Sequence, residues 1–424
     1  MPEIITSQDA QYALKLVKRI CDEVGPGLPG SSKERERAEI IKKELETHLG
    51  AENVVVEEFT LAPGAFLGSL PLSALLMLMA ALLNISIANI GGIKPWLSAI
   101  LALVFSVSAF LSFFFEYIKY FEFVDPLFRK TQSENVIGTL QKPGSKKVER
   151  LLILSGHHDS ALENTWIGLL GYGLYITVPT IFIGLITMIV MSTIQLTGLI
   201  TGNADIIRIG TLGWVPLIYP LGPAVIFGMF FNRGRKNGGT VPGAADNLSA
   251  CALAVAMCRF LVRNPSYIPE DTEIRFISFG SEEAGLRGSR RYVAAHLDEL
   301  KHLDVRLLNF ETVAYPEIVI STSDVGSVKH SPDLVDSVVA AAERAGVPHK
   351  VKPSPTGGGG TDAGSFSQAG LKAVTLLPFK VPQQLVAFYH QKEDTPEILT
   401  IEPLLNVLKL TFEWICNSGG GKKH

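Results

Sequence analysis

The stretch Glu273-Ile-Arg-Phe-Ile-Ser-Phe279, followed directly by Gly280-Ser-Glu-Glu-Ala-Gly-Leu-Arg-Gly288, predicts both a fold and a site. Its first half is apolar like a buried strand, and its second half is rich in glycine, as loops are. Two adjacent carboxylates, Glu282 and Glu283, lie where the strand gives way to the loop. Charges are costly beside a buried strand end, so this pair indicates a functional role.

Acidic and imidazole side chains occupy the same kind of place elsewhere in the chain. The apolar run 151–155 leads into Gly156-His157-His158-Asp159, and the run 305–310 leads directly to Glu311. The turn Gly243-Ala-Ala-Asp246-Asn247 opens an apolar helix. Ligands in open α/β sheets gather where strands end, so we expect these side chains to converge. With His390, in a predicted loop, the candidates are His157, Asp159, Asp246, Glu282, Glu283, Glu311 and His390.

Two metal ions account for this set better than one. Zinc accepts His nitrogen and carboxylate oxygen, and a two-metal site needs a carboxylate that bridges the ions. Asp246 could be that bridge. His157 and Glu311 would then complete one ion. Glu283 and His390 would complete the other.

Glu282 and Asp159 remain outside this ligand set. Glu282 is adjacent to a ligand but free to act as a general base. Asp159 could accept the second N–H of the His157 imidazole and so fix its tautomer. Taken alone, a His-x-Asp at a strand end is usually structural, and Asp246 could simply cap its helix. The joint occurrence of all these features at strand and loop ends favours the metal site.

Other titratable residues are expected to be structural. Asp394 lies just before Thr395-Pro396-Glu397, a good helix start, so we expect it to cap a helix or form a turn rather than support the site. The histidines expected at the surface or in packing are His158, His296, His302, His330 and His349.

In this order the residues resemble the co-catalytic di-zinc exopeptidases, a family that includes bacterial leucyl-type aminopeptidases and glutamate carboxypeptidase. The family's pattern is His-x-Asp, Asp-Asn or Asp-Asp in a Gly-Ala-rich turn, Glu-Glu, Asp or Glu, and a late His. The resemblance extends to Gly285-Leu-Arg-Gly-Ser289, Gly360-Thr-Asp362 and the stretch Gly30-Ser-Ser-Lys-Glu-Arg. It implies two zinc ions and a peptide substrate. Many members have Asp in place of Glu311, and His in place of Ala363.

Segments outside the most apolar runs alternate between strand and helix patterns. Such alternation predicts an α/β fold with a mostly parallel central sheet and helices on both faces. The resemblance implies the same three-layer α/β/α architecture. Strands are expected at 53–59, 135–140, 151–155, 273–279, 305–310 and 373–377, and helices at 9–23, 32–49, 247–261, 331–345 and 403–417.

Long uncharged runs are the second large feature of the chain. No charged residue occurs at 59–93, 95–115, 164–204 or 209–232. A bilayer span takes about 20 apolar residues, and buried core helices rarely reach such lengths without a charge. Spans are therefore expected at about 67–90, 95–117, 172–198 and 209–231.

These spans are expected to form two hairpins. His157 and Asp246 flank the second pair of spans yet must meet at one site, so the chain has to return to the side that it left. The predicted zinc exopeptidase domain is then discontinuous, with transmembrane hairpins inserted into it. Its segments are 1–62, 121–164 and 235–424, and the hairpins are 63–120 and 165–234.

Charge places the catalytic side in the cytoplasm, within a multi-pass protein of the cell membrane. Positive residues favour the cytoplasmic side, and the opposite loops offer only Lys94 and Arg208. The N-terminal sequence lacks a signal-peptide pattern, and the 4 cysteines show no disulfide framework. The basic residues on the catalytic side are Lys119, Arg129, Lys130, Arg233, Arg235 and Lys236.

Composition agrees with a membrane-embedded enzyme. The 424 residues are 47% hydrophobic with a mean hydropathy of +0.27, which is high for a soluble enzyme. A net charge of −3 gives no argument for nucleic-acid binding. We therefore predict a membrane-embedded zinc exopeptidase, with an aminopeptidase as the preferred activity. The alternatives are a carboxypeptidase or other amide hydrolase on the same site, and a catalytically silent membrane scaffold or receptor.

Overall fold

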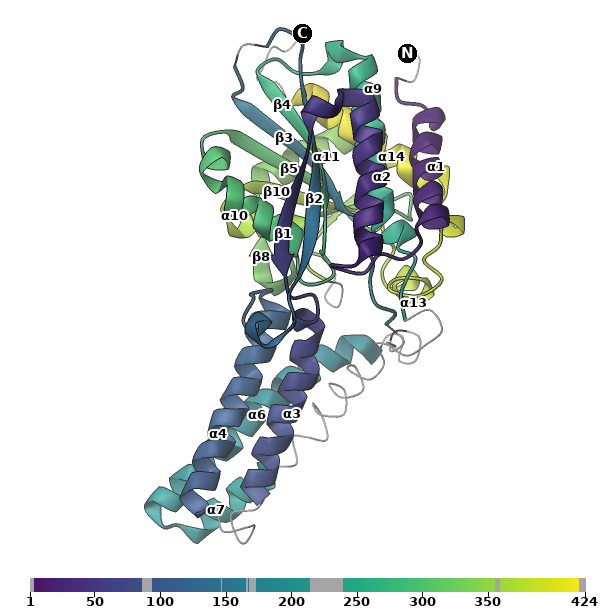
Figure 1. The fold of residues 1–424 in the computed structure, drawn as a ribbon. Coiled ribbons are helices and arrows are strands. Elements are labelled where there is room, and N and C mark those ends of the chain that lie inside the picture. The colour runs from purple at the N-terminus through teal and green to yellow at the C-terminus, as the bar shows by residue number, and fades with distance from the viewer. Residues whose placement is uncertain are drawn as a thin grey trace. The chain divides into compact units, whose positions relative to one another are not determined.

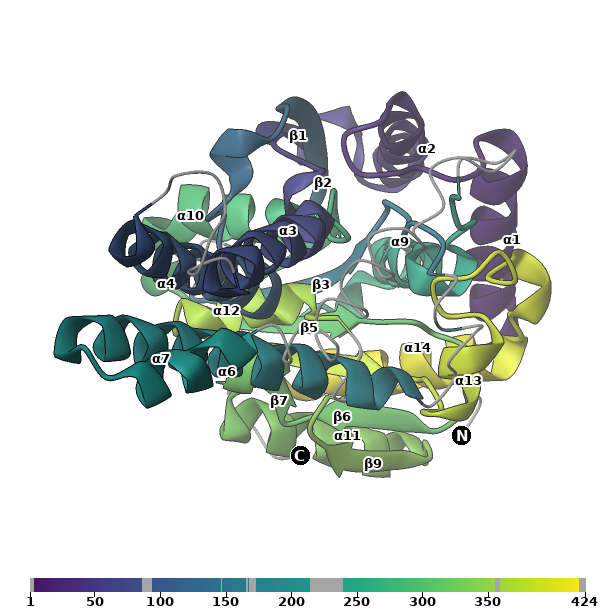
Figure 2. The same ribbon diagram turned by 90° about the horizontal axis from the view of Figure 1, so that it is seen from below.

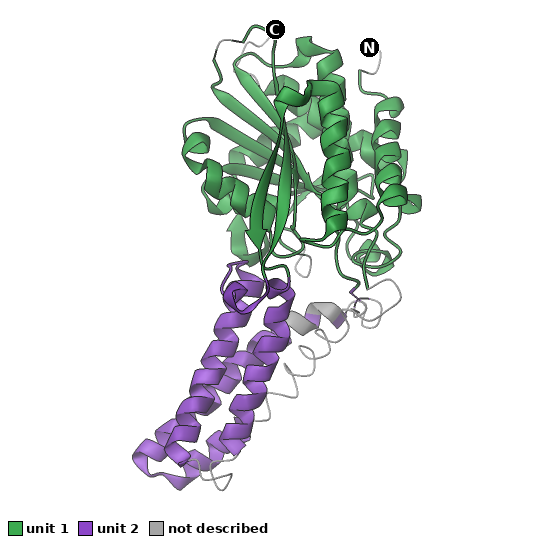
Figure 3. Ribbon diagram, in the orientation of Figure 1, with its two compact units in different colours: residues 1–63, 130–163, 234–424 green, residues 64–129, 164–233 purple. Residues whose placement is uncertain are grey.

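The chain divides into two compact units (Figure 3). The computed structural model describes residues 4–85, 94–145, 147–164, 167, 173–213, 239–354 and 359–418. Unit 1 comprises Met1–Pro63, Lys130–Glu163 and Gly234–His424, and unit 2 comprises Gly64–Arg129 and Asn164–Arg233.

A mixed sheet runs through unit 1, with the strand order β1-β2-β4-β3-β5-β10-β6-β9 (Figure 2). Strands β4, β3, β5 and β10 are parallel to one another, whereas β1 and β2 join the sheet by antiparallel pairing. The predicted α/β fold with a mostly parallel centre is confirmed. The strands are β1 (Val54–Leu61), β2 (Thr131–Gln141), β3 (Arg150–His157), β4 (Thr272–Phe279), β5 (Asp304–Phe310), β6 (Ile318–Ser321), β9 (His349–Lys352) and β10 (Lys372–Leu377). A separate short ribbon pairs β7 (Ser323–Asp324) with β8 (Val328–Lys329).

Helices cover both faces of this sheet (Figure 1). On one face α10 and α12 pack against the strands, and on the other α9 contacts β3 and β4 and is itself covered by α1, α2 and α14. The helices of unit 1 are α1 (Ser7–Glu23), α2 (Ser32–Leu49), α9 (Ser249–Arg263), α10 (Arg287–Lys301), α11 (Pro332–Ala345), α12 (Asp362–Gln368), α13 (Gln383–Ala387) and α14 (Ile401–Asn417).

Burial on both faces explains the apolar run at the centre of the sheet. Leu151 and Ile153 face the core beneath α10 and α12, while Leu152 and Leu154 point to the opposite face. All four are 0% exposed, as expected for a parallel strand enclosed between two helical layers. Helix α9 approaches β3 so closely that a Cβ on Gly156 would lie 2.3 Å from the Cβ of Ala250. This approach brings the start of α9 beside the end of β3.

Unit 2 consists of apolar helices with apolar outer surfaces. They are α3 (Ala65–Ile85), α4 (Pro95–Leu111), the π-helical η3 (Ser112–Ile118), α6 (Leu174–Thr201) and α7 (Ala204–Gly210). Among the described residues, every exposed large apolar side chain apart from Ile4, Val55 and Val351 belongs to this unit. Unit 2 therefore exposes large apolar side chains of the kind that unit 1 buries in its core.

Four described helices are long and apolar enough to cross a membrane. Three are Ala65–Ile85, Pro95–Ile118 and Pro179–Thr201, which lie at the first three predicted spans and are 33–39% buried. The fourth, Ala244–Arg263, is 89% buried and packs on the sheet of unit 1, so we interpret it as a core helix. Most of the predicted span 209–231 lies outside the described residues.

Candidate metal centre

The candidate residues of the sequence come together at one edge of the sheet in unit 1. His157 ends β3, Glu282 and Glu283 follow β4, and Glu311 follows β5. These three strands are neighbours and parallel, so their carboxyl ends meet. Asp246 comes from η7 (Ala244–Leu248) just before α9, and His390 follows α13.

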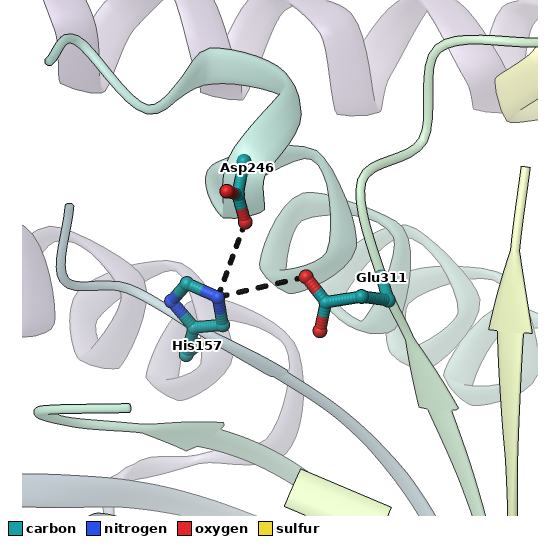
Figure 4. A group of neighbouring side chains, drawn as sticks. All are labelled: His157, Asp246 and Glu311. Atoms are coloured by element: carbon teal, nitrogen blue, oxygen red, sulfur yellow. Dashed lines mark ion pairs between the residues drawn. The ribbon is translucent and has the colours of Figure 1, made fainter. Parts of the chain in front are cut away.

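Asp246 occupies the middle of this group. Its Oδ1 lies 3.4 Å from His157 Nε2, and its Oδ2 lies 3.1 Å from His390 Nε2. Glu311 Oε1 is 3.7 Å from the same His157 nitrogen (Figure 4). Glu283 Oε1 is 3.2 Å from His390 Nε2. The carboxylate of Asp246 thus directs one oxygen to each of two small groups of donor atoms.

Each group has the donor set that a divalent metal takes. His157, Asp246 and Glu311 form one, and Asp246, Glu283 and His390 form the other; within each, the donor atoms lie within 4.8 Å of one another. Asp246 Oδ2 and Glu283 Oε1 are buried without a hydrogen-bond partner among the described residues, although both are within ion-pair distance of His390. Unpaired buried oxygens that face an imidazole nitrogen suit nitrogen-and-oxygen coordination of zinc.

Glu282 lies at the edge of the first group. Its Oε2 is 3.7 Å from His157 Nε2, and it forms a further compact set with His157 and Glu283. Burial raises the pKa of Glu282 well above its usual value, and the nearby carboxylates of Glu283 and Glu311 raise it further, against the opposing effect of His157. A carboxylate whose pKa is raised in this way binds a proton more readily than an ordinary glutamate does, as a general base must.

Asp159 contacts both the imidazole of His157 and the loop that carries Glu282 and Glu283. Its Oδ1 is 3.2 Å from His157 Nδ1 and accepts a hydrogen bond from the backbone N–H of Glu282 at 3.0 Å. Its Oδ2 accepts from the N–H of Glu283 at 2.9 Å. Burial opposes ionisation of Asp159, but the contact with His157 outweighs it and lowers the pKa of this carboxyl. One buried carboxylate thus orients three candidate residues.

Two residues hold Glu311 and were not predicted to support the site. Asn247 donates from Nδ2 to Glu311 Oε2 at 3.2 Å, and its Oδ1 accepts from the N–H of Thr312 at 3.2 Å. Asn309 lies 3.4 Å from the same Glu311 oxygen. Asn247 neighbours Asp246 in the chain, so it links the segments that carry two candidate ligands.

The expectation that Asp394 is only a cap or turn residue is wrong. Its side chain is 0% exposed and accepts hydrogen bonds from the backbone N–H groups of Ala245 at 2.7 Å and of Asp246 at 3.1 Å. Burial raises the pKa of Asp394 to about 8, and the charge of Asp246 adds to the effect. Asp394 therefore fixes the backbone that carries Asp246. In the sequence, the helix-start pattern at Thr395-Pro396 predicts a local capping role and gives no indication of this long-range contact.

Tyr389 is a further residue that sequence reasoning missed. Its ring stacks on His390 with centroids 4.0 Å apart. Burial and the charges of Asp246, Glu283, Glu311 and Glu282 raise the pKa of Tyr389 well above its usual value. Its hydroxyl therefore remains protonated at neutral pH, while its ring packs against a candidate ligand. Its place directly before the late histidine was the only available signal.

The other histidines are placed as expected, in packing or at the surface. His158 is buried, with Nδ1 2.9 Å from Ser278 Oγ, and burial lowers its pKa to about 4. Ala363, in α12 at the position where many members of the resembled family have His, is 0% exposed and packs in the core between this helix, α10 and the sheet. In this chain the residue at that position therefore contributes to core packing.

Part of the chain is similar to known peptidases. Residues 232–415 match the family model described as peptidase family M28. Over 167 residues the chain is 34% identical to the aminopeptidase YwaD of Bacillus subtilis (strain 168), an alignment that covers 38% of this chain and 35% of that protein. The chain thus matches about a third of that relative's length.

Solved structures share the fold at lower identity. The zinc aminopeptidase BSAP of Bacillus subtilis has a TM-score of 0.53 at 17% identity, covering 98% of this chain and 96% of that one. A glutaminyl cyclase of an Acidobacteriales bacterium has a TM-score of 0.53 at 13% identity, covering 96% and 93%. These likenesses show a shared fold. The segment that matches peptidase family M28, residues 232–415, carries Asp246, both glutamates, Glu311 and His390.

Proposed function

We propose that this chain is a zinc-dependent aminopeptidase with two zinc ions per catalytic unit. The observation that carries the proposal is the placement of Asp246, whose two carboxylate oxygens each face a different histidine. The match to peptidase family M28 supports a metallo-exopeptidase. The relatives named as aminopeptidases favour attack at the amino end of the peptide.

In this proposal His157 and Glu311 would hold one zinc ion, Glu283 and His390 would hold the other, and both ions would share Asp246. Bound zinc would polarise the scissile carbonyl and lower the pKa of an attacking water. Glu282 accepts the proton of that water and delivers it to the leaving amine. Asp159 keeps the imidazole of His157 oriented and fixes the backbone of both glutamates through their N–H groups.

Peptides that differ only at the amino end test the activity. The purified full chain, loaded with zinc, should release the first residue of a peptide with a free amino terminus and spare its N-acetylated copy. A chelator should abolish this release, and added zinc should restore it. Cleavage from the carboxyl end would refute the aminopeptidase assignment. Loss of ammonia from an N-terminal glutamine without peptide cleavage would indicate a cyclase instead.

We also propose that unit 2 crosses the cell membrane four times and that unit 1 faces the cytoplasm. The exposed apolar side chains of α3, α4 and α6 support insertion, because a monomeric soluble protein rarely exposes so much apolar surface. The basic residues of the catalytic side support the orientation, since Lys and Arg favour the cytoplasmic side of a membrane.

Thiol labelling in intact cells tests this topology. In a cysteine-free background, single cysteines near Gly92 and Asn203 should react with an impermeant reagent, whereas one near Asn237 should react only after lysis. Labelling at position 237 from outside would overturn the orientation. Opposite labelling at positions 163 and 237 would overturn the even number of spans, because both positions flank the same predicted hairpin.

A further inference from the structure

The first turns of α2 contain a buried acid and a buried base. Glu34 is 1% exposed and Arg37 is 0% exposed, one helical turn apart. Both belong to the stretch that follows the N-cap Ser31, whose side chain accepts from the N–H of Glu34. Ionised side chains are rarely buried completely unless they meet specific partners. Neither residue belongs to the candidate metal centre, so the partners of each indicate its role.

Glu34 binds the loop that carries the general base. Its Oε1 accepts from the backbone N–H of Ser281 at 2.6 Å and from Ser281 Oγ at 2.7 Å. Its Oε2 accepts from the N–H of Gly30 at 2.6 Å. Ser281 directly precedes Glu282 and has a positive φ of 54°. Glu34 therefore stabilises the turn from which the side chain of Glu282 projects.

Arg37 binds the segments that carry His157 and Asp246. It donates from Nη1 to the carbonyl of His158 at 3.1 Å and from Nη2 to the carbonyl of Pro242 at 2.6 Å. Its Nε donates to the carbonyl of Gly25 at 2.8 Å. His158 follows the candidate ligand His157, and Pro242 opens the turn that leads to Asp246. The guanidinium thus joins two ligand-bearing segments that are far apart in the sequence.

Gly27 leaves room for this arrangement. A Cβ at this position would lie 2.8 Å from Arg37 Cδ, which is closer than real contacts allow. The backbone of Gly27 is also paired with Ser160, since its carbonyl accepts from Ser160 N at 2.8 Å and its N–H donates to Ser160 Oγ at 3.0 Å. The loop before α2 is therefore held next to the His157–Asp159 segment by contacts of its own.

From these contacts we infer that Glu34 and Arg37 are positioning residues with separate tasks in the reaction proposed above. Glu34 sets the place of the base Glu282 through Ser281. Arg37 sets the places of His157 and Asp246 through the carbonyls of their neighbours. The inference rests on the proposed function, and it predicts that the two residues affect different measured quantities.

Removing the carboxylate of Glu34, which accepts the hydrogen bonds of Ser281, should lower kcat. In Glu34→Leu, both donors of Ser281 lose their partner, so kcat should fall about 10- to 100-fold, as for other residues that orient a metal site. Zinc content and KM should stay close to those of the wild type. Glu34→Gln should recover most of the activity, because its side-chain oxygen can still accept from both groups of Ser281.

Removing the guanidinium of Arg37 should weaken zinc binding. In Arg37→Met, zinc affinity measured by competition with a chelator should fall about 10- to 100-fold, and excess zinc should restore kcat. Arg37→Lys should not rescue the affinity, because a single ammonium cannot reach three separate carbonyls. If Arg37→Met does not fold, Gly27→Ala displaces the same side chain and should lower zinc affinity in the same way.

Surface substitutions on the same helix serve as controls. Lys33 and Glu36 form an ion pair with side chains 48% and 50% exposed, so Lys33→Met and Glu36→Leu should change neither quantity. Wild-type zinc affinity in Arg37→Met, or wild-type kcat in Glu34→Leu, would overturn the inference. An equal loss of both quantities in the two variants, in step with thermal stability, would also overturn it. If the wild-type chain binds zinc without cleaving peptides, the proposed function fails while the Arg37 experiment can still be read.

Discussion

Replacing Asp159 by Asn should weaken the site more than its small change of shape suggests. The carboxylate is 0% exposed and offers only acceptors to the N–H groups of Glu282 and Glu283 and to the imidazole of His157. An amide of the same size can keep only one of the two oxygens. The substitution therefore removes acceptor capacity while leaving the volume of the core unchanged.

The loss can be derived from the contacts. If the amide oxygen of the substituted side chain takes the place of Oδ1, it keeps Glu282 and His157, but the new NH₂ group then faces the N–H of Glu283, which is 2.9 Å from Oδ2 in the wild type. The opposite orientation forfeits the contacts to Glu282 and His157. At least one hydrogen bond to a charged acceptor is lost, at about 1.5–3 kcal/mol. That corresponds to a factor of roughly 10 to 150.

Zinc retention and kinetics measured together test this prediction. Asp159→Asn should lose zinc at a chelator concentration about 10- to 100-fold lower than the wild type does, and its kcat should fall by a similar factor. Asp333→Asn is a matched control, because Asp333 is exposed on α11 and pairs with Lys372 at the surface, away from the candidate centre. If Asp159→Asn retains zinc and turnover like the control, the carboxylate does not orient the site and the reasoning is wrong.

Three further predictions concern other parts of the molecule. Asp246→Ala should lower zinc content at both positions, whereas His390→Ala should mainly weaken one; full zinc occupancy in Asp246→Ala would refute the bridge. Asp394→Ala should lower zinc affinity about 10- to 100-fold, because the N–H groups of Ala245 and Asp246 lose their acceptor, and unchanged affinity in a chelator competition would contradict that role. Phe123, 48% exposed just beyond η3, should lie at the headgroup level. In a background whose 4 native tryptophans are replaced by Phe, the fluorescence of Phe123→Trp should then be quenched by lipids brominated near the headgroup, and that of Val351→Trp on β9 should not; equal quenching of both would refute the placement.

The central strands could be predicted from the sequence because they are buried on both faces. β3 ends in an imidazole, and the apolar runs of β4 and β5 are followed within three residues by a carboxylate. The edge strand β9 was missed, because His349–Lys352 is short and mostly polar, as an exposed edge allows. Helix α10 was missed as well, since it begins inside the glycine-rich loop after the glutamates.

Side-chain support of the site was harder to predict than the candidate ligands. The ligand types and their order are visible in the sequence, whereas a hydrogen bond between residues about 150 positions apart is not. Asp394 carries a strong local signal for a helix start, and tertiary structure uses its carboxylate elsewhere. From the sequence, Glu34 and Arg37 are expected on the charged surface of a helix. Their burial could not be predicted, because it depends on the loops that pack over α2.

Substitution of Glu282 tests the central claim most directly, because the proposal makes this residue the base and not a ligand. Glu282→Gln should keep two zinc ions per chain while kcat falls by about 10²–10⁴-fold, the range that general acid–base catalysis contributes. Its neighbour supplies the comparison, since Glu283→Gln should lose zinc. Turnover like that of the wild type in Glu282→Gln, or loss of zinc from that variant, would contradict the account.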